Sequence, residues 1–331
     1  MTPAPPEMNI HLGIDIGGTW VKYGAIDPEG HILFSDRAPT RGNEGQAATL
    51  DGIVDCARAM IDWAAQAGHR PVSIGIGSPG TINPRTHVVQ PPTPNLTTII
   101  GVNLVDVVQR ATELPTAIDN DANCAAWAEH CYGAGRGIDN LICITVGSGI
   151  GSGFIVDGHI FSGPNGNGAE LGHVTIDWHG PRCPCGNHGC LELYASANAV
   201  VRKANGAADD APAGTLARLR RRDGGIMTVA AVFEAFTSGD QDARALLTAS
   251  AHELAMGILS AVNLFDPEAL IIGGGLADAD TSGFWLSQVA GRIHVHAFSA
   301  EGKTLRVGKA ALGNDAGFIG AAALGALWVR Q

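Results

Sequence analysis

Residues 10–27 read IHLGIDIGGTWVKYGAID, and this stretch decides the fold. An apolar run ends at the pair Gly17-Gly18, strand-like sequence then resumes, and a turn at residues 27–30 leads into HILFSD. Apolar runs separated by glycine bends are typical of consecutive strands. The stretch therefore predicts a meander of two or three strands with a glycine bend between the first two.

A second copy of this element lies 130 residues further along the chain. Ile14-Asp15-Ile16-Gly17-Gly18 aligns with Ile144-Thr145-Val146-Gly147-Ser148, which opens the run from residue 144 to FIVDGHIF. A repeated supersecondary unit suggests two domains of one topology that face each other. The alternative is that any two glycine-rich hairpins would align as well.

Length and composition bound the fold class. The chain has 331 residues, which at about 150 residues per domain predicts two domains with sizeable cores. Glycine accounts for 45 residues, about twice its usual share. Only 16% of residues are charged and the glycines follow no triplet period, so the chain is neither disordered nor collagen-like. The glycines must serve turns, close backbone approaches or phosphate loops.

Charge and apolar content give expectations about partners and location. The formal net charge of −11 disfavours nucleic acid, and the cluster of Arg218 with Arg220–Arg222 is expected to be a solvated face. MTPAPPEMNI lacks the features of a secretory signal, and no run of about 18 apolar residues would span a membrane. We expect a cytoplasmic protein with no membrane and no nucleic-acid partner.

Apolar periodicity places the helices and one irregular segment. Helices are expected over residues 46–67, 101–112, 122–130, 240–264 and 315–329. Strands are expected in PVSIGIGSPG, PTAIDND and DPEALIIGGG. Residues 203–225 show no clear apolar period, so we expect a mobile loop or a poorly packed segment there.

Three glycine-rich bends could bind phosphate. Besides the two hairpins there is Gly273-Gly274-Gly275, and glycine allows backbone N–H groups to approach phosphate oxygens. Asp15 could hold Mg²⁺ through water, and Thr19 adds a hydroxyl. The Walker and dinucleotide motifs are both absent from the sequence. A single bend is more often a simple tight turn, but three together favour a nucleotide.

Polar side chains follow the strand expected in PTAIDND. Asn120 and Asp121 stand at its carboxyl end, where a carboxylate could accept a proton from a substrate hydroxyl. The alternative is that Asp121 is the N-cap of the next helix. Asn95, in PPTPNL, could hold a sugar hydroxyl or be an ordinary turn residue.

Residues 170–192 combine acids, an imidazole and clustered thiols. Glu170, His173 and Glu192 are candidates for gripping uncharged sugar hydroxyls. Cys183, Cys185 and Cys190 form a C-x-C-x₄-C pattern, and three thiolates with one histidine fit a closed, structural zinc site. His173 is one possible fourth ligand, with His179 and His188 as competitors. The alternative is three surface thiols without metal. The remaining thiols suit reduced cysteines: Cys56, Cys124, Cys131 and Cys143.

The motifs IDIGGT, NDAN, GxGxGxG, ELGH, CPCGNHGCLE and LIIGGG resemble, in this order, those of the ROK family of bacterial sugar kinases, repressors and open reading frames. The resemblance extends over nearly the whole chain. It implies a two-domain, actin-like and ribonuclease-H-like α/β fold with an interdomain cleft that binds ATP and a hexose. The C-terminal helix would return to the N-terminal domain. The expected domains are residues 1–119 with 312–331, and residues 120–311.

The resemblance also implies a role for each candidate side chain. Asp121 would be the general base that deprotonates the sugar 6-hydroxyl for attack on the γ-phosphate. The sugar hydroxyls would be held by Asn95, Asn120, Asp121, Glu170, His173 and Glu192. Phosphates would be cradled by Gly17, Gly18, Thr19, Gly147, Ser148 and Gly149, with Mg²⁺ near Asp15. Adenosine would lie at Gly273, Gly274 and Gly275. Structural Zn²⁺ would be bound by His173, Cys183, Cys185 and Cys190.

The implied activity is that of an ATP-dependent hexose 6-kinase of the glucokinase type. Glucose is the expected sugar, glycolysis the expected pathway, and a homodimer or tetramer the expected assembly. The family also includes N-acetylmannosamine and N-acetylglucosamine kinases, allokinases and fructokinases. A sugar-responsive repressor would carry a helix-turn-helix domain before the first glycine loop, where only a short segment stands here. A sugar-binding protein without catalysis is disfavoured by the presence of Asp121.

Overall fold

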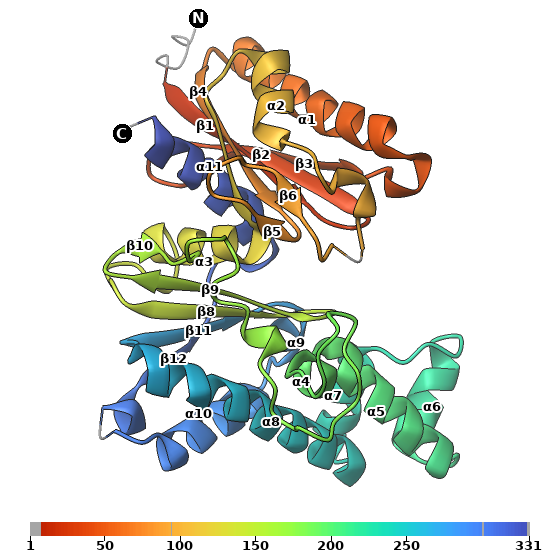
Figure 1. Ribbon diagram of the computed structural model, residues 1–331. Helices are drawn as coiled ribbons and strands as arrows, with labels where there is room; N and C mark the ends of the chain where they lie inside the picture. The colour runs from red at the N-terminus through yellow and green to blue at the C-terminus, as the bar shows by residue number, and fades with distance from the viewer. Residues whose placement is uncertain (1–7, 94, 300, 330–331) are drawn as a thin grey trace, which may run out of the picture. The chain divides into compact units, whose positions relative to one another are not determined.

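The computed structural model describes residues 8–93, 95–299 and 301–329. The chain divides into two compact α/β units (Figure 1). The first unit comprises the chain up to residue 139, residues 153–169 and the chain from residue 314; the second comprises residues 140–152 and 170–313. The α/β class is confirmed. The helix that begins at Asp121 belongs to the first unit, whereas the sequence placed the start of the second domain at residue 120.

A five-stranded sheet in the order β3-β2-β1-β4-β7 forms the first unit. Its strands are β1 (Asn9–Ile16), β2 (Trp20–Ile26), β3 (Ile32–Pro39), β4 (Arg70–Ser78) and β7 (Thr116–Asn120). β1 and β3 both pair antiparallel with β2, and β4 lies parallel to both β1 and β7. The predicted meander is confirmed, and the glycine bend joins β1 to β2. Ile10, Leu12 and Ile14 point to one face of the sheet, where they are fully buried in a core cluster with Ile53 and Met60.

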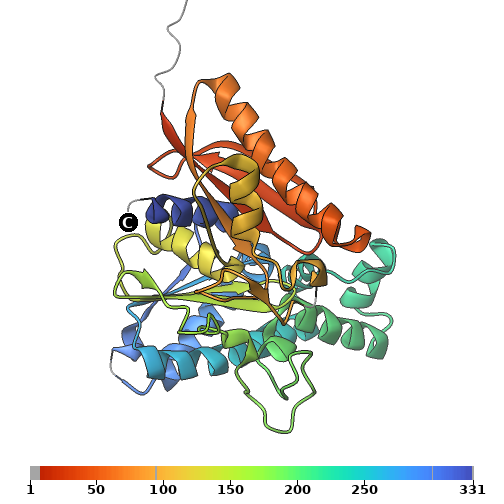
Figure 2. The same cartoon turned by 45° about the horizontal axis from the view of Figure 1, so that its top comes forward.

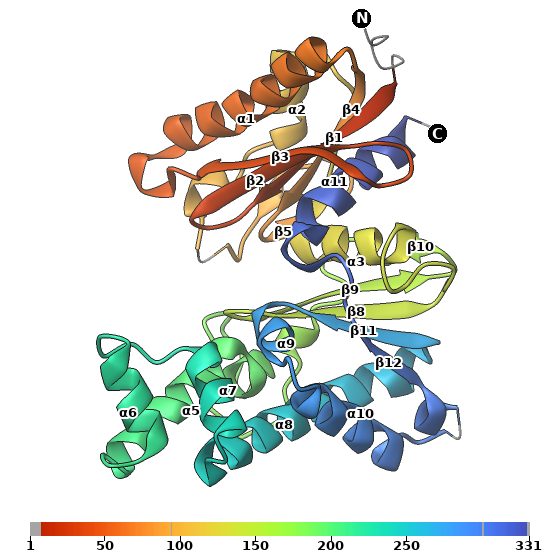
Figure 3. The ribbon, with the colours of Figure 1, turned by 180° about the vertical axis from the view of Figure 1, so that it is seen from behind.

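Four helices cover this sheet. α1 (Gln46–Ala67) and α2 (Leu104–Thr112) lie on one face, and α3 (Asp121–Cys131) and α11 (Ala316–Trp328) lie on the other (Figures 1 and 3). Gly68 ends α1 with φ at +73°, a left-handed conformation that costs glycine no strain. α11 packs beside α3 (Figure 2), which confirms that the C-terminal helix returns to the N-terminal unit.

Glycines allow α11 to approach the sheet closely. A Cβ atom at Gly13 on β1 would lie 1.9 Å from the carbonyl oxygen of Phe318. A Cβ atom at Gly75 on β4 would lie 1.6 Å from the carbonyl oxygen of Ala321. Both distances are far inside van der Waals contact, so a larger residue at either position would push the helix away.

Short elements complete the first unit. They are η1 (Gly42–Glu44), β5 (Thr81–Ile82), β6 (Val89–Gln90), η2 (Thr97–Ile99) and β10 (His159–Ile160). β5 and β6 pair antiparallel. Another 3₁₀ turn, η5 (Gly313–Asp315), leads into α11.

The second sheet repeats the topology of the first. Its order is β10-β9-β8-β11-β12, with β8 (Leu141–Val146), β9 (Ile150–Val156), β11 (Ala269–Gly273) and β12 (Arg306–Lys309). β11 is parallel to β8 and β12, as β4 is to β1 and β7, and β10 is antiparallel to β9. The internal echo therefore reflects a real repeat in which β8 takes the place of β1. The boundary between the units falls within β9, after Ser152.

Helices make up most of the second unit. They are η3 (Leu171–His173), α4 (Glu192–Ala195), α5 (Ala197–Asp210), α6 (Thr215–Arg222), α7 (Val229–Thr237), α8 (Gln241–Phe265), α9 (Gly275–Ala279), α10 (Phe284–His296) and η4 (Gly302–Thr304). By length and hydropathy α8 alone among the described helices could cross a membrane, and half of its apolar window is buried inside the protein.

The expectation of a mobile loop or poorly packed segment at residues 203–225 is wrong. Most of that segment forms the end of α5 and all of α6, and it buries Ala204, Ala208, Leu216 and Leu219. The apolar period is weak in this part of the sequence, because small alanines form much of the buried face and the exposed face is rich in arginine. The predicted solvated face is confirmed, since Arg218, Arg221 and Arg222 are exposed and Arg222 forms an ion pair with Glu234. Arg220 is partly buried and forms an ion pair with Asp209.

Candidate active site

Asn120 and Asp121 lie where β7 passes into α3. The side-chain oxygen of Asn120 accepts hydrogen bonds from the N–H groups of Ala122 (2.8 Å) and Asn123 (3.3 Å). Its amide nitrogen donates to the carbonyl oxygen of Gly80 (3.1 Å). Asn120 is thus the N-cap, so the alternative that Asp121 takes this position is wrong. Asp121 is the first helical residue, and its Oδ1 also accepts from the Ala122 N–H, at 2.8 Å.

Sequence reasoning did not single out Asp119, the residue before this pair. Its Oδ1 accepts from the Asn120 N–H at 2.7 Å and from the Asn123 amide at 2.8 Å, and its Oδ2 accepts from the Ser162 hydroxyl at 3.5 Å. Burial raises the pKa of Asp119, and these hydrogen bonds oppose the shift. Its place at the end of a strand was the one signal in the sequence.

Hydrogen bonds to nearby segments of the same chain hold the first glycine bend in place. The Gly17 N–H donates to the carbonyl oxygen of Trp20 (2.9 Å), and the Thr40 hydroxyl donates to the carbonyl oxygen of Gly17 (2.7 Å). A Cβ atom at Gly18 would lie 3.1 Å from the Cβ of Asn95, which brings two of the predicted site residues together. Neither glycine has a positive φ, so close approach is what the bend requires of them.

Asp15 lies on β1 just before this bend. Burial raises its pKa from 3.8 to about 6, and the charge of Lys22 on β2 opposes the shift. The Lys22 ammonium donates to the carbonyl oxygen of Asn314 at 2.7 Å. A Cβ atom at Gly317 would lie 2.4 Å from Asp15 Oδ2, so the start of α11 closes over the carboxylate. A carboxylate with so little solvation would gain from a bound cation.

In the second unit, the two other glycine loops meet. Gly274 has φ at +89°, and a Cβ atom there would lie 2.6 Å from the nitrogen of Val146, the residue before Gly147. The Gly147 N–H donates to the carbonyl oxygen of Gly149 at 3.0 Å. A Cβ atom at Gly149 would lie 2.8 Å from Glu192 Oε2, so this loop also adjoins a predicted sugar ligand.

Glu170, His173 and Glu192 come together through η3 and α4. His173 Nδ1 lies 3.7 Å from Glu192 Oε1. Burial and the nearby Glu192 charge raise the pKa of Glu170, and His173 acts in the opposite direction. η3 is fixed to β9, because the Ser152 hydroxyl accepts from the Leu171 N–H at 3.1 Å. The three predicted side chains therefore form one polar group.

The four predicted zinc ligands also form one group. The ligand atoms of His173, Cys183, Cys185 and Cys190 all lie within 4.8 Å of one another. The Sγ atoms of Cys185 and Cys190 are 3.7 Å apart, and Cys183 Sγ is 3.8 Å from His173 Nδ1. A tetrahedron with Zn–S bonds of about 2.3 Å has edges of about 3.8 Å, so the donor set fits Zn²⁺.

Backbone hydrogen bonds shape the loop that carries the thiols. The Cys183 N–H donates to the carbonyl oxygen of Asn187 at 2.7 Å, and the Gly186 N–H donates back to that of Cys183 at 2.9 Å. Burial opposes ionisation of Cys185, but a backbone N–H and two neighbouring thiols outweigh it and lower its pKa. Neither competing histidine, His179 nor His188, belongs to the metal-binding group.

Each unit thus carries part of the predicted machinery. The first holds the strand-end acid, the first glycine bend and two of the amides: Asp15, Gly17, Gly18, Thr19, Asn95, Asn120 and Asp121. The second holds the other loops, the sugar-binding group and the metal site: Gly147, Ser148, Gly149, Glu170, His173, Cys183, Cys185, Cys190, Glu192, Gly273, Gly274 and Gly275. The carboxylates and the glycine loops offer acid–base and anion-binding chemistry, as phosphoryl transfer to a hydroxyl would use, and the thiol group is separate from that chemistry.

Comparison with known proteins identifies the family. The ROK family model matches residues 11–326. A glucokinase of Halalkalibacterium halodurans is 33% identical over 320 residues, which covers 94% of this chain and 93% of the relative. An N-acetylmannosamine kinase of Shigella boydii is 31% identical, with 95% and 97% covered.

Solved structures agree with the sequence comparison. The crystal structure of a ROK family glucokinase from Streptomyces griseus, in complex with glucose and AMPPNP, superposes with a TM-score of 0.83 at 32% identity. The match covers 96% of this chain and 99% of that one. The two-domain actin-like fold is therefore confirmed, and the chain belongs to the ROK family.

Proposed function

We propose that this protein is an ATP-dependent hexose kinase that phosphorylates the 6-hydroxyl of glucose. The observation that carries the proposal is similarity along nearly the whole chain to glucokinases, one of them solved with glucose and AMPPNP. The motifs that carry the proposed base, the glycine loops and the possible metal ligands support the proposal, because they occur in this sequence in the order expected of the family. The proposal requires both units to present their groups to the same pair of substrates.

Asp121 is the proposed general base. It stands at the carboxyl end of β7, the edge where α/β proteins bind ligands, and the cap at Asn120 fixes its backbone. There the carboxylate would accept the proton of the 6-hydroxyl as its oxygen attacks the γ-phosphorus. A positioned base contributes about 10² to 10⁴ in rate.

The remaining sugar hydroxyls would bind carboxylates and amides from both units. Asn95 and Asn120 are the proposed ligands from the first unit, and Glu170, His173 and Glu192 those from the second. Carboxylates accept hydrogen bonds from hydroxyls and amides both donate and accept, so this set suits vicinal hydroxyls. A sugar bound at several points would keep its 6-hydroxyl oriented toward Asp121.

The three glycine loops are the proposed ATP site. Residues 17–19 and 147–149 would hold the phosphates through backbone N–H groups, and residues 273–275 would adjoin the adenosine. Mg²⁺, when bound, neutralises phosphate charge during transfer. Asp15 is the candidate to hold it, since its buried carboxylate has only Lys22 to offset its charge.

Zn²⁺ is proposed as a structural metal at His173, Cys183, Cys185 and Cys190. When bound, it would fix the loop between η3 and α4 by four ligand bonds. His173 faces the thiols through Nδ1, which leaves its Nε2 edge for a substrate hydroxyl. The metal would thereby orient an imidazole that binds sugar.

A coupled ATP assay over a panel of hexoses tests this proposal. We expect ADP release with glucose and the highest kcat/KM for that sugar among glucose, mannose, fructose, allose and the two N-acetylated hexosamines. Glucose 6-phosphate should be the product. Absence of ADP release with every sugar would refute the kinase, and sugar binding without turnover would indicate a binding protein or regulator.

N-acetylmannosamine is the second candidate substrate, because a kinase for that sugar is 31% identical over 95% of this chain. The same panel separates the two, since a preference for the N-acetylated sugar would reverse the order of kcat/KM. We further propose a cytoplasmic homodimer that acts in glycolysis, and light scattering on the purified protein would measure the assembly.

A further inference from the structure

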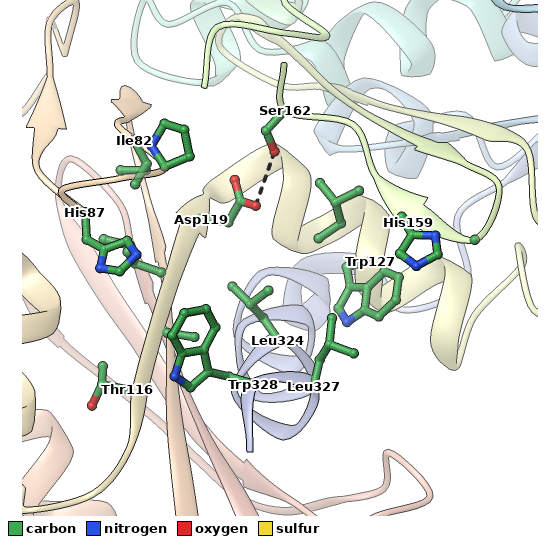
Figure 4. A pocket seen from close by; sticks show the side chains of 15 residues that line it. Ile82, His87, Thr116, Asp119, Trp127, His159, Ser162, Leu324, Leu327 and Trp328 are labelled. Atoms are coloured by element: carbon green, nitrogen blue, oxygen red, sulfur yellow. Dashed lines mark hydrogen bonds between the residues drawn. The ribbon is translucent and has the colours of Figure 1, made fainter. Parts of the chain in front are cut away.

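A cavity of about 340 Å³ lies inside the first unit, apart from the proposed sugar and ATP residues. β7, α3, the β9–β10 hairpin and the end of α11 form its walls (Figure 4). Most of the lining is apolar, with Ile82, Leu324 and Leu327 among its residues. This volume and a mainly apolar wall with a few polar groups are typical of sites for small molecules.

The first polar group at the cavity is the Asp119 carboxylate. No Lys or Arg lines the cavity, and no ion pair joins Asp119 to any residue that the structure describes. Asp119 is partly buried, and a carboxylate that loses hydration is seldom found without a cationic partner, because that loss is costly. Its hydrogen bonds to Asn120, Asn123 and Ser162 offset only part of that cost. A ligand with a cationic donor would supply the missing charge.

The second polar group is the indole N–H of Trp127. This side chain is 8% exposed, and its Nε1 is buried without a hydrogen-bond partner in the described structure. Buried indole N–H groups usually find an acceptor, and one without a partner loses free energy. In Figure 4 the carboxylate of Asp119 and the indole of Trp127 lie on different sides of the cavity, above Leu324 and Trp328 of α11.

We propose that this cavity binds a small amphipathic amine: an ammonium group donates to Asp119, an apolar body packs on α11, and an acceptor receives the Trp127 N–H. Trp328, which is 51% exposed, and His87 meet edge to face at 6.0 Å between ring centroids and form an aromatic wall for that body. The ligand needs both its ammonium group and its acceptor, because the first pairs with the Asp119 carboxylate and the second with the Trp127 N–H.

Tyramine is a probe that carries these three features. We would titrate it by calorimetry into the full chain without hexose or nucleotide, so the result does not depend on the proposed kinase activity. A molecule with ten non-hydrogen atoms should bind with a dissociation constant from about 10 µM to 1 mM. 4-Hydroxyphenylacetate has the same hydroxyphenyl ring with a carboxylate in place of the aminomethyl group, and it should bind at least about 10-fold more weakly.

Two substitutions test separately the proposed contact with the Trp127 N–H and the proposed contact with the Asp119 carboxylate. Trp127→Phe keeps the ring but removes the N–H, so tyramine should bind about 5-fold more weakly while 2-phenylethylamine, which lacks the acceptor, is unaffected. Asp119→Asn removes the charge and should weaken tyramine by about 10-fold or more. If that variant does not fold, the comparison of tyramine with 4-hydroxyphenylacetate on the unaltered chain still tests the charge.

A larger side chain that fills the cavity tests whether tyramine binds there. Leu324→Trp should abolish tyramine binding in a protein whose circular dichroism is unchanged. The proposal is overturned if tyramine gives no saturable heat up to about 10 mM, or if 4-hydroxyphenylacetate binds as tightly. Equal weakening of tyramine and 2-phenylethylamine by Trp127→Phe would also overturn it.

Discussion

Asn120 caps the helix that begins with Asp121: its side-chain oxygen lies 2.8 Å from the N–H of Ala122, while its amide nitrogen donates to the carbonyl oxygen of Gly80. One side chain therefore ties β7, α3 and the turn after β4 together. The acid beside it owes its backbone position to this arrangement. The two residues can be separated by experiment in the ligand-free protein and in the assay, because Asn120 is expected to act on stability as well as on sugar binding, whereas Asp121 is expected to act on rate.

Asn120→Ala should destabilise the protein by about 1–2 kcal/mol, because α3 loses its cap and Gly80 loses a donor. Urea unfolding of the ligand-free protein measures this. Asn120→Asp keeps the capping oxygen and should recover part of the loss. Equal stability of Asn120→Ala and the parent chain would show that the cap is dispensable.

Asp121→Asn should lower kcat by about 10² to 10⁴ while glucose binding, measured by calorimetry, changes little. The amide is nearly isosteric but cannot take the proton of the 6-hydroxyl. Asp51→Asn, on the exposed face of α1, is the matched control and should retain full turnover. Near-normal turnover in Asp121→Asn would remove this residue from the role of base.

Metal analysis of the purified protein should find about one zinc per chain. Cys190→Ser should lose it and lower the Tm by about 5–10 °C, since the ligands fix a loop with little core of its own. Cys131→Ser, a partly exposed thiol outside the cluster, should keep the metal. The proposed structural role of zinc is contradicted if metal-free protein shows the same Tm and the same sugar affinity as the metal-loaded form.

Asp15 predicts a pH-dependent stability. Its pKa is raised to about 6, so the folded state holds a proton that the unfolded chain releases near pH 4. The folded protein therefore loses stability as pH rises from about 4 to 6, and the cost persists above that range. Asp15→Asn removes it, so this variant should gain about 2–3 kcal/mol over the parent chain between pH 4 and pH 7.

The measurement for Asp15 is urea unfolding across that pH range without nucleotide or Mg²⁺. Asp62→Asn, at an exposed position of α1, should follow the parent curve. A constant difference between Asp15→Asn and the parent chain at all pH values would contradict burial as the source of the shift. Activity should fall in Asp15→Asn if this carboxylate holds Mg²⁺.

Gly75→Ala should destabilise the first unit by several kcal/mol, because the added methyl group would lie 1.6 Å from the carbonyl oxygen of Ala321. Gly206→Ala is the matched control. Gly206 lies on the exposed side of α5 with nothing within 4 Å of the added atom. That substitution should stabilise the protein by about 0.5–1 kcal/mol. Thermal unfolding of both variants tests the contrast.

The sequence predicted best those structural features that are determined by residues close together in the chain. The bounds of α1 follow from apolar spacing and a terminal glycine, and the repeat at residues 144–148 foretold a second sheet of the same order. The cysteine spacing likewise predicted three thiols that would lie together with a histidine, although the spacing alone left the choice among His173, His179 and His188 open. In each case the informative residues are near one another in sequence.

What could not be predicted depends on contacts between distant segments. The sequence did not predict α6, because the buried face of this helix is recognisable only once α5 and α7 pack against it. The sequence did not predict the cavity beside Asp119, because its walls come from four distant parts of the chain: residues near 82–87, residues 116–119 with Trp127, residues 158–162, and the end of α11. No local pattern in any of these segments indicates that they meet around a carboxylate without an ion pair and an indole N–H without a hydrogen-bond partner in the described structure.

The close approach of α11 to the sheet changes how the glycines of this chain should be interpreted. Gly13 and Gly75 are as intolerant of a side chain as any loop glycine, yet neither belongs to the proposed nucleotide loops. A glycine in this chain can therefore be required by the short distance between a helix and a sheet. A functional role should be assigned to such a glycine only once the backbone next to it is known.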